Sequence, residues 1–401
     1  MNFQIFKSKY VKSLIINLLL VFNVSAQTLS PQATVSLLTV DAGNEELYTV
    51  FGHSVMRVQD PIQGIDWVYN YGVFDFRTPN FYLKFVRGQL PYQLLAYDFY
   101  LQFDEWKTDN RLVTEQKLNL TQRQKQTIFD FLQKNFLPEN REYFYKFFYD
   151  NCSTRIRDVV ANSLKDSLQL STTLHADSSY RQWIDKYSAK RKPWGAFGMD
   201  IGLGLPSDEK TGAMGAMFLP KNMADAFEAA KVLRDGKWQP LVLEKHPVNI
   251  EYLKPELKPS NIFTPNSVFW TLAIAVILLT FWQFKKGVKG FLFDTILFSI
   301  VGLAGWFLVI LWFFTDHVVT SQNLNIIWTF PFLFPVALML KKVNSKAWLK
   351  SFFLIYALVV LVFALAGVLL KLLPQGVNMA VLPINILLII RVLFVVYRLK
   401  K

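Results

Sequence analysis

The stretch YDNCSTR, residues 149–155, contains the only cysteine of the chain, Cys152. Asp150, Asn151 and Ser153 are residue types that cap helices, and apolar residues follow them at helical spacing. We therefore predict that a helix begins near Cys152. A thiol in the first turn of a helix lies at the positive end of the helix dipole, which favours the thiolate. The stretch predicts a nucleophilic cysteine, with a buried structural cysteine as the alternative.

A nucleophilic thiol needs a general base, and the chain contains four histidines. His53 lies in the stretch FGHSVMR, residues 51–57, whose alternating side chains are typical of a strand. A strand holds an imidazole firmly, whereas His175 and His246 lie in polar or proline-flanked stretches that are typical of the surface. We take His53 as the base; a histidine that only packs in the core is the alternative.

Two neighbouring strands are expected around this histidine. Residues 50–58 and 67–76 are rich in β-branched and aromatic side chains, and a segment with proline and glycine separates them. Asn70 lies on the second strand, where its amide oxygen could accept a hydrogen bond from the second imidazole nitrogen. The remaining candidates for orienting the ring or supporting an oxyanion are Tyr71, Ser54 and Asn151.

Other catalytic signatures are missing from the sequence. It has no G-x-S-x-G, no H-E-x-x-H, no phosphate-binding loop and no paired cysteine. We therefore predict neither a metal ion nor an organic cofactor. The aromatic run at residues 143–149 is typical of ordinary core packing; a wall along a fatty acyl chain is the alternative.

The composition is that of a membrane protein. Of 401 residues, 52% are hydrophobic and 18% are charged, and the mean hydropathy of +0.24 is too high for one water-soluble domain. Five apolar segments after about residue 265 are candidate transmembrane helices. They comprise residues 267–284, 291–314, 324–340, 351–370 and 379–397. Pro331 and Pro335 should kink the third segment, and Arg391 in the fifth is expected to anchor it at the inner face.

The net charge of +13 reflects membrane topology rather than a nucleic-acid-binding surface. From residue 261 onward the chain has twelve Lys or Arg and two acidic residues, whereas residues 13–260 are neutral overall. Ten of these positive charges lie on alternate connections between the apolar segments, which marks that side as cytoplasmic. The domain before the segments therefore faces outward, and no nucleic-acid partner is expected.

The N-terminus has the pattern of a secretory signal, with three lysines, an apolar stretch and Val24-Ser25-Ala26 as a cleavage site; an uncleaved anchor is the alternative. The chain thus divides into a signal peptide, an exported domain, a linker and a five-helix transmembrane domain. Their expected bounds are 1–26, 27–240, 241–265 and 266–401. The exported domain mixes helices and strands, and its Gly-rich residues 191–206 are expected to form a loop.

A strand histidine followed 99 residues later by a cysteine at a helix start resembles the permuted papain-like dyad of NlpC-like and lecithin:retinol acyltransferase-like proteins. The chain as a whole resembles the Lnb-type lipoprotein N-acyltransferases of the Bacteroidota. The stretches that carry this resemblance are Phe51-Gly52-His53, Asn70-Tyr71-Gly72, Asp150-Asn151-Cys152-Ser153-Thr154, Met217-Phe218-Leu219-Pro220 and Thr315-Asp316-His317.

The resemblance implies an α+β, permuted papain-like domain in the periplasm, followed by a five-helix bundle in the bacterial inner membrane. It implies Cys152 and His53 as the catalytic pair. Such an enzyme takes a fatty acyl group from a phospholipid as a thioester. It then transfers the group to the α-amino group of a diacylglyceryl-cysteine lipoprotein. Phospholipid, diacylated lipoproteins and the membrane are the expected partners, and no cofactor is expected.

Two other functions remain open. A membrane-tethered NlpC-like cysteine hydrolase acting on peptidoglycan would use the same pair, but it gives no reason for five helices. A non-enzymatic membrane scaffold would leave Cys152 dispensable.

An outward loop of the membrane part holds a group of polar side chains without Lys or Arg. These are Asp316, His317, Asn323 and Asn325. We expect them to dock against the catalytic domain or to orient a substrate head group. A polar loop in the head-group region is the alternative.

Overall fold

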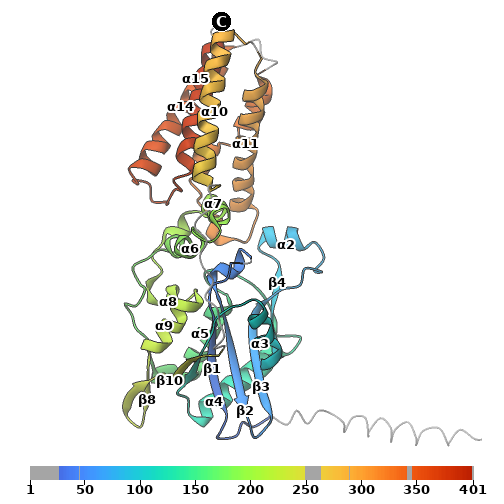
Figure 1. The fold of residues 1–401 in the computed structure, drawn as a ribbon, viewed down its shortest axis with the longest axis vertical. Helices are drawn as coiled ribbons and strands as arrows, with labels where there is room; N and C mark the ends of the chain where they lie inside the picture. Colours follow the sequence, from blue (N-terminus) through green and yellow to red (C-terminus); the bar gives the residue numbers. More distant parts are fainter. Residues whose placement is uncertain (1–26, 45, 249–262, 289, 341–345, 400–401) are drawn as a thin grey trace, which may run out of the picture.

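A computed structural model describes residues 27–44, 46–248, 263–288, 290–340 and 346–399. The expected signal peptide and most of the expected linker lie outside these residues. Figure 1 shows a mixed α/β domain at one end of the molecule and a helical bundle at the other. This agrees with the predicted fold class of an α+β domain followed by membrane helices.

The first domain is built on one antiparallel sheet in the order β10-β5-β1-β2-β3-β4-β6. Its strands are β1 (Thr34–Val40), β2 (His53–Asp60), β3 (Ile65–Val73), β4 (Pro91–Asp98), β5 (Val113–Leu118), β6 (Glu142–Phe144) and β10 (Val242–Pro247). Successive residues of β1 point to opposite faces, and Leu37 and Leu38 belong to two different apolar clusters. The sheet therefore has a core on each side.

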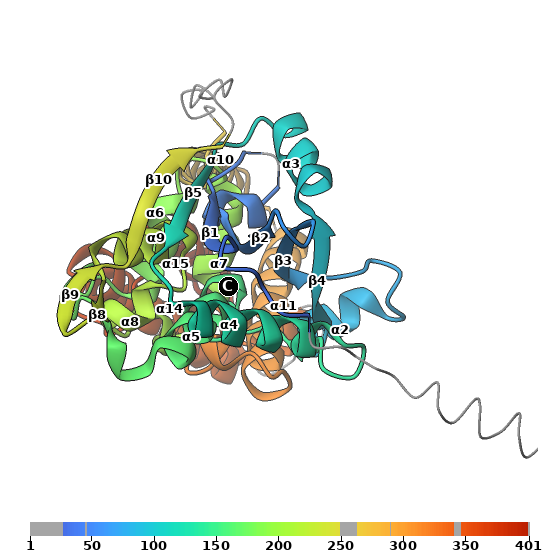
Figure 2. The same ribbon diagram turned by 90° about the horizontal axis from the view of Figure 1, so that it is seen from below.

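Helices cover both faces of this sheet, as Figure 2 shows for α4, α5 and α3. On one face lie α4 (Gln122–Phe136), α5 (Cys152–Leu164) and α9 (Pro220–Ala229), which bury Ile128, Ile156 and Phe227 against the strands. On the other face α3 (Phe99–Thr108) buries Phe99 and Trp106. The remaining elements are η1 (Tyr48–Phe51), α2 (Phe81–Arg87), η2 (Lys165–Ser167), β7 (Leu168–Gln169), α6 (Tyr180–Ser188), α7 (Pro193–Gly202), η3 (Leu205–Asp208), α8 (Gly212–Ala216), β8 (Lys231–Arg234) and β9 (Lys237–Pro240).

Among the described residues, four helices are long and apolar enough to cross a membrane. They are α10 (Pro265–Lys286), α11 (Leu292–Phe313), α14 (Lys346–Phe363) with its π-helical end η5 (Ala364–Leu369), and α15 (Val381–Leu399). A 3₁₀ turn, η4 (Val318–Thr320), follows α11.

The third expected span is a broken helix instead of a continuous one. It consists of α12 (Ile326–Thr329) and α13 (Leu333–Met339), because Pro331 and Pro335 provide no N–H groups for a continuous helix. The break packs closely on α11. A Cβ atom at Gly305 would lie 2.4 Å from the Thr329 carbonyl oxygen, so only glycine allows this approach.

Three other expectations are wrong in detail. Residues 191–206 are not a continuous loop, because α7 begins at Pro193, a residue that suits the first turn of a helix. The expected linker 241–265 begins with β10, which pairs with β5. Arg391 lies at the inner end of the bundle, as expected of an anchor, but its side chain is fully buried, 2.7 Å from the Asp294 carboxylate in the first turn of α11.

The two domains meet at α7, as Figure 1 shows. Its residues Phe197 and Ile201 pack against the apolar core of the bundle. Buried Arg181 of α6 holds both Asp200 and Asp208 on the same side of the contact. Hydrogen bonds from the bundle then reach these acids: Asn378 Nδ2 lies 2.7 Å from Asp200 Oδ2, and Gly376 N lies 2.9 Å from Asp208 Oδ1. The periplasmic domain is therefore joined to the bundle by a buried polar contact.

Candidate active site

Cys152 is the first residue of α5, as the sequence predicts, and Asn151 is the N-cap. The Asn151 side chain is fully committed to this role. Its Oδ1 accepts from Thr154 N at 2.9 Å, and its Nδ2 donates to the carbonyl oxygens of Phe147 and Phe218 at 2.7 and 2.8 Å. Hydrogen bonds from the Asn151 side chain, both to the helix and to the preceding segment, therefore hold the thiol at the start of α5.

His53 is the first residue of β2, and its half-buried ring contacts the buried thiol of Cys152. Its Nε2 lies 2.7 Å from Asn70 Oδ1 on the neighbouring strand β3. Asn70 Nδ2 in turn lies 3.1 Å from Gln102 Oε1, and Gln102 Nε2 lies 2.6 Å from the Glu105 carboxylate. The predicted base, its predicted orienting residue and the thiol are thus brought together.

The Glu105 carboxylate sets the direction of these hydrogen bonds. An ionised carboxylate only accepts, so Gln102 turns its NH₂ group to Glu105 and its oxygen to Asn70. Asn70 then presents its own oxygen to His53, and Nε2 must carry the proton. This leaves Nδ1 as the imidazole nitrogen that can take a proton from Cys152.

The electrostatics of the pair favour a thiolate and an imidazolium. Burial works against both charges, but the opposite charge and a hydrogen bond from the partner outweigh it, so the pKa of Cys152 is lowered and the pKa of His53 is raised. The Ser54 backbone N–H and the Ser153 hydroxyl also lower the thiol pKa. The pair is therefore suited to nucleophilic chemistry through the thiolate.

The other residues proposed to orient the reactants have different surroundings. The Ser54 hydroxyl lies 3.0 Å from that of Ser153 in a buried contact between β2 and α5. Tyr71 points away from the histidine and donates to Asn135 Oδ1 at 2.6 Å. Of the candidates, Asn70 is the one whose side chain contacts the His53 ring.

The sequence did not single out the space beside the thiol. Gly72 has a φ of +91° at an irregularity in the β3–β4 pairing, and a Cβ there would lie 3.4 Å from Tyr145 Cε2 and 3.9 Å from Cys152 Cβ. The Tyr143 hydroxyl borders the same point at 4.0 Å. It is buried and has no hydrogen-bond partner among the described residues. A glycine inside a strand was the available signal, because such a residue often marks a close approach or a bulge.

This site lies at the end of the sheet that faces the membrane bundle. η1, directly before His53, contributes Val50 and Phe51 to an apolar cluster that also contacts Val319 from the loop after α11. Phe147, five residues before Cys152, packs on Phe51 with ring centroids 4.9 Å apart. The catalytic pair is therefore separated from the bundle by one layer of side chains.

The four polar residues of the outward membrane loop fall into two groups. Asp316 and His317 contact α2: Gln89 Nε2 lies 2.9 Å from Asp316 Oδ2, and His317 Nε2 lies 3.0 Å from the Phe85 carbonyl oxygen. Asn323 and Asn325 are buried and donate to backbone oxygens at the end of α7. All four contact the periplasmic domain, and they lie apart from the Cys152–His53 contact.

In the described part of the chain, no group of three or more His, Cys, Asp or Glu side chains could hold a metal ion. Residues 23–186 match the family profile of the Lnb N-terminal periplasmic domain, and residues 257–401 match that of the Lnb transmembrane domain. The chain belongs to the Lnb family. No curated protein and no solved structure matches the chain.

Membership in the Lnb family assigns the two domains to their compartments. The protein lies in the inner membrane, with the domain that contains Cys152 in the periplasm. The family also indicates a membrane enzyme that processes lipoproteins. Cys152, His53 and Asn70 lie within the first matched range, 23–186.

Proposed function

We propose that this protein is a lipoprotein N-acyltransferase. It transfers a fatty acyl group from a phospholipid to the α-amino group of a diacylglyceryl-cysteine lipoprotein, through a thioester on Cys152. The observation that carries the proposal is a thiol and imidazole in contact, at the end of the periplasmic sheet nearest the membrane bundle. Both substrates are lipids whose reacting groups lie at that surface.

In the first half-reaction the Cys152 thiolate attacks the ester carbonyl of the phospholipid. The C–S bond forms, the ester C–O bond breaks, and the lysophospholipid oxygen takes the proton from the His53 imidazolium. Asn70 keeps the ring oriented through Nε2 during this transfer. The products are an acyl-thioester and a neutral imidazole.

In the second half-reaction the lipoprotein α-amine attacks the thioester carbonyl. The amide C–N bond forms, the C–S bond breaks, and His53 takes the proton that the amine loses, so the thiolate–imidazolium pair is restored. An α-amine has a pKa of about 7.7 to 8.0, so an appreciable fraction is already neutral near pH 7. The atoms and charges of both steps balance with the substrates, Cys152 and His53 alone.

Each half-reaction passes through an oxyanion, and we propose the Tyr143 hydroxyl as a donor to it. The hydroxyl is buried, lacks a partner in the described chain, and borders the space over Gly72 beside the thiol. The Arg155 guanidinium lies over the Tyr143 ring, 3.4 Å from its centroid. A preorganised donor at the carbonyl oxygen is worth about 10²- to 10³-fold in kcat.

Mass spectrometry of lipoprotein N-termini tests the reaction. In a strain that lacks the chromosomal copy, wild-type protein should yield triacylated N-termini, whereas Cys152→Ser and His53→Ala should leave them diacylated at equal protein level. Ser163→Ala, on the same helix as the nucleophile, is the matched control and should behave as wild type. Full N-acylation by Cys152→Ser would refute the proposal and favour a scaffold. Unchanged lipoproteins with altered peptidoglycan fragments would favour a hydrolase.

A further inference from the structure

α2 is an apolar helix that the protein does not bury. None of its residues is buried, and Tyr82, Leu83 and Phe85 are 77%, 58% and 51% exposed. Phe76, in the turn before the helix, is 65% exposed. A helix of seven residues has little stability of its own in water, and packing of an apolar face normally supports it. In the described part of the chain, Phe76, Tyr82 and Phe85 contact only the rings of Phe74 and Phe81, and more than half of each of these side chains stays exposed. This apolar surface is therefore available to contact lipid.

The height of α2 relative to the membrane is fixed by hydrogen bonds to the end of a span. α11 ends at Phe313, and three residues later Asp316 N donates to the Arg87 carbonyl oxygen at 2.9 Å. Gly88 lies against the His317 ring, where an added Cβ would be 3.3 Å from Cε1. α11 has 22 residues, which is about the hydrocarbon thickness of a bilayer. Figure 1 shows α2 just beyond the end of α11, near the junction of the two domains. This position corresponds to the outer boundary of the bilayer.

Aromatic rings connect α2 with the thiol. The ring of Phe81 lies 5.8 Å from that of Phe74, Phe74 lies 5.4 Å from Tyr92, and Tyr92 stacks on Tyr145 at 4.6 Å. Tyr145 borders the space beside Cys152 described above. A continuous apolar wall thus extends from the exposed helix to the nucleophile.

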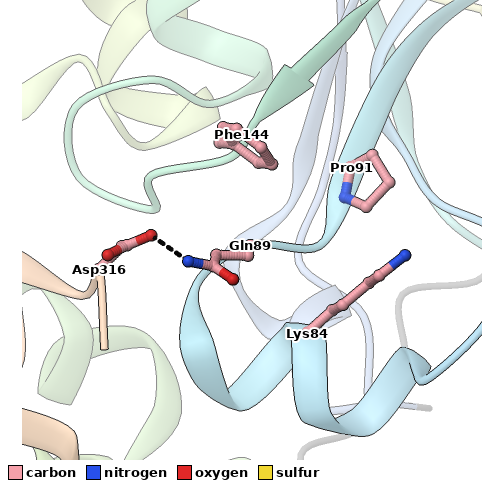
Figure 3. Close-up of a pocket in the computed structure, with 5 residues that line it drawn as sticks. All are labelled: Lys84, Gln89, Pro91, Phe144 and Asp316. Atoms are coloured by element: carbon pink, nitrogen blue, oxygen red, sulfur yellow. Dashed lines mark hydrogen bonds between the residues drawn. The ribbon is translucent and has the colours of Figure 1, made fainter. Parts of the chain in front are cut away.

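A cavity of about 370 Å³ opens between α2, the start of β4 and the loop after α11. Figure 3 shows its lining residues, Lys84, Gln89, Pro91, Phe144 and Asp316. Phe144 pairs with Pro91 at this edge of the sheet, and successive side chains of a strand alternate between its faces, so the cavity lies across the edge from Tyr92 and Tyr143. Lys84 and Arg87 in the last turn of α2 place positive charge at the level of lipid phosphates.

We propose that α2 inserts into the outer leaflet of the inner membrane and that the acyl donor reaches Cys152 along it. The apolar residues contact acyl chains, Lys84 lies near the phosphate, and one acyl chain lies along the Phe74–Tyr92–Tyr145 wall. The occupant of this surface is a phospholipid, because α2 is attached to the end of a membrane span and combines aromatic with cationic side chains. The role of α2 in delivering the acyl donor rests on the proposed acyl transfer. The insertion of α2 into the membrane does not depend on that reaction.

Depth-dependent quenching tests the insertion. Cys152 is the only cysteine, so Cys152→Ser gives a cysteine-free background. An environment-sensitive fluorophore attached through Tyr82→Cys, in full-length protein in nanodiscs, should be quenched by phospholipids with a nitroxide high on the acyl chain. The matched control is Phe131→Cys on α4, which is 48% exposed and lies far from the bundle in Figure 1. Equal quenching at both positions, or none at position 82, would overturn the insertion.

A second measurement connects the surface with the substrate. Leu83→Ser and Tyr82→Ser together should lower kcat/KM for a phospholipid donor at least tenfold, because two apolar side chains that contact lipid are replaced by polar ones. Alkylation of Cys152 by iodoacetamide, which needs no lipid, should be unchanged. Unchanged kcat/KM would overturn the role in donor delivery. If no wild-type transfer occurs while position 82 is still quenched, the proposed reaction fails and the insertion remains.

Discussion

Removal of His53 should change the ionisation of Cys152 without removing the thiol from its pocket. In the wild type the imidazolium is the main influence that lowers the thiol pKa against the effect of burial. In His53→Ala the burial remains and the partner charge is lost, so the thiol pKa should rise to its ordinary value or above. The Ser54 N–H and the Ser153 hydroxyl only partly replace the lost charge.

The size of the effect follows from the ionised fraction. A thiol with an ordinary pKa of about 8.5 is about 3% ionised at pH 7, and full ionisation sets the upper limit of the difference between the two proteins. Alkylation at pH 7 should therefore slow by up to about thirtyfold in His53→Ala, because the thiolate is the reacting species. At every pH below the thiol pKa of the variant, the wild-type thiol is the more ionised of the two. The wild-type protein should therefore be alkylated faster throughout that pH range.

Intact-mass measurement of iodoacetamide labelling, from about pH 5 to about pH 10, gives the profile of each protein. The wild-type rate should rise at lower pH than the rate of His53→Ala, and the two rates should converge at the alkaline end, where both thiols are ionised. Convergence is the internal control for an accessible, folded pocket. Superimposable profiles would refute the ion pair.

Four further outcomes are expected. Tyr143→Phe should reduce kcat by about 10²-fold and leave alkylation of the thiol unchanged, because it removes an oxyanion donor only; normal turnover would exclude that role. Burial, with Asp200 nearby, raises the pKa of Asp185 to about 7, so the unfolded chain releases this proton at lower pH than the folded chain. Stability should therefore fall from about pH 4 to about pH 7 through this group, and Asp185→Asn should remove that slope in thermal unfolding curves. Asp294→Asn should destabilise the bundle by about 3 to 5 kcal/mol, since Arg391 would be left buried without its anion, and thermal unfolding in detergent should show no change if the pair is unimportant. His317→Ala should impair transfer from phospholipid while Cys152 still reacts with iodoacetamide, because the ring contacts the Phe85 carbonyl of α2; loss of both would indicate a folding defect.

Local sequence patterns predicted the parts of this protein that depend on local physics. The capping residues around Cys152 determined where α5 begins, and the alternation around His53 determined a strand. Asn70 followed from the same pattern, because adjacent antiparallel strands bring such residues side by side. The long apolar helices α10, α11, α14 and α15 were predicted from hydropathy alone, within a few residues of their ends.

The features that the sequence did not predict depend on contacts between distant segments. The prolines predicted a kink in the third span, but the close packing of the broken helix on Gly305 of α11 could not be predicted from local sequence. Arg391 was predicted to anchor the fifth span at the inner face, but its burial depends on a contact with Asp294, 97 residues earlier, which the sequence did not predict. Tyr143 in an aromatic run resembles ordinary core until the structure places its unpaired hydroxyl beside the thiol. The pairing of β10 likewise joins residues more than a hundred positions apart.

The contact around buried Arg181 fixes the distance between the periplasmic domain and the membrane bundle. Asp200 and Asp208 are held by Arg181 on one side and by Asn378 and Gly376 of the bundle on the other, so the domain cannot swing without breaking hydrogen bonds to two carboxylates. Cys152 is consequently kept at one height above the bilayer. For the proposed reaction, the distance of an amine from the membrane then decides whether it can react. The N-terminus of a lipid-anchored protein stays at the height of Cys152, whereas the N-terminus of a freely diffusing peptide does not.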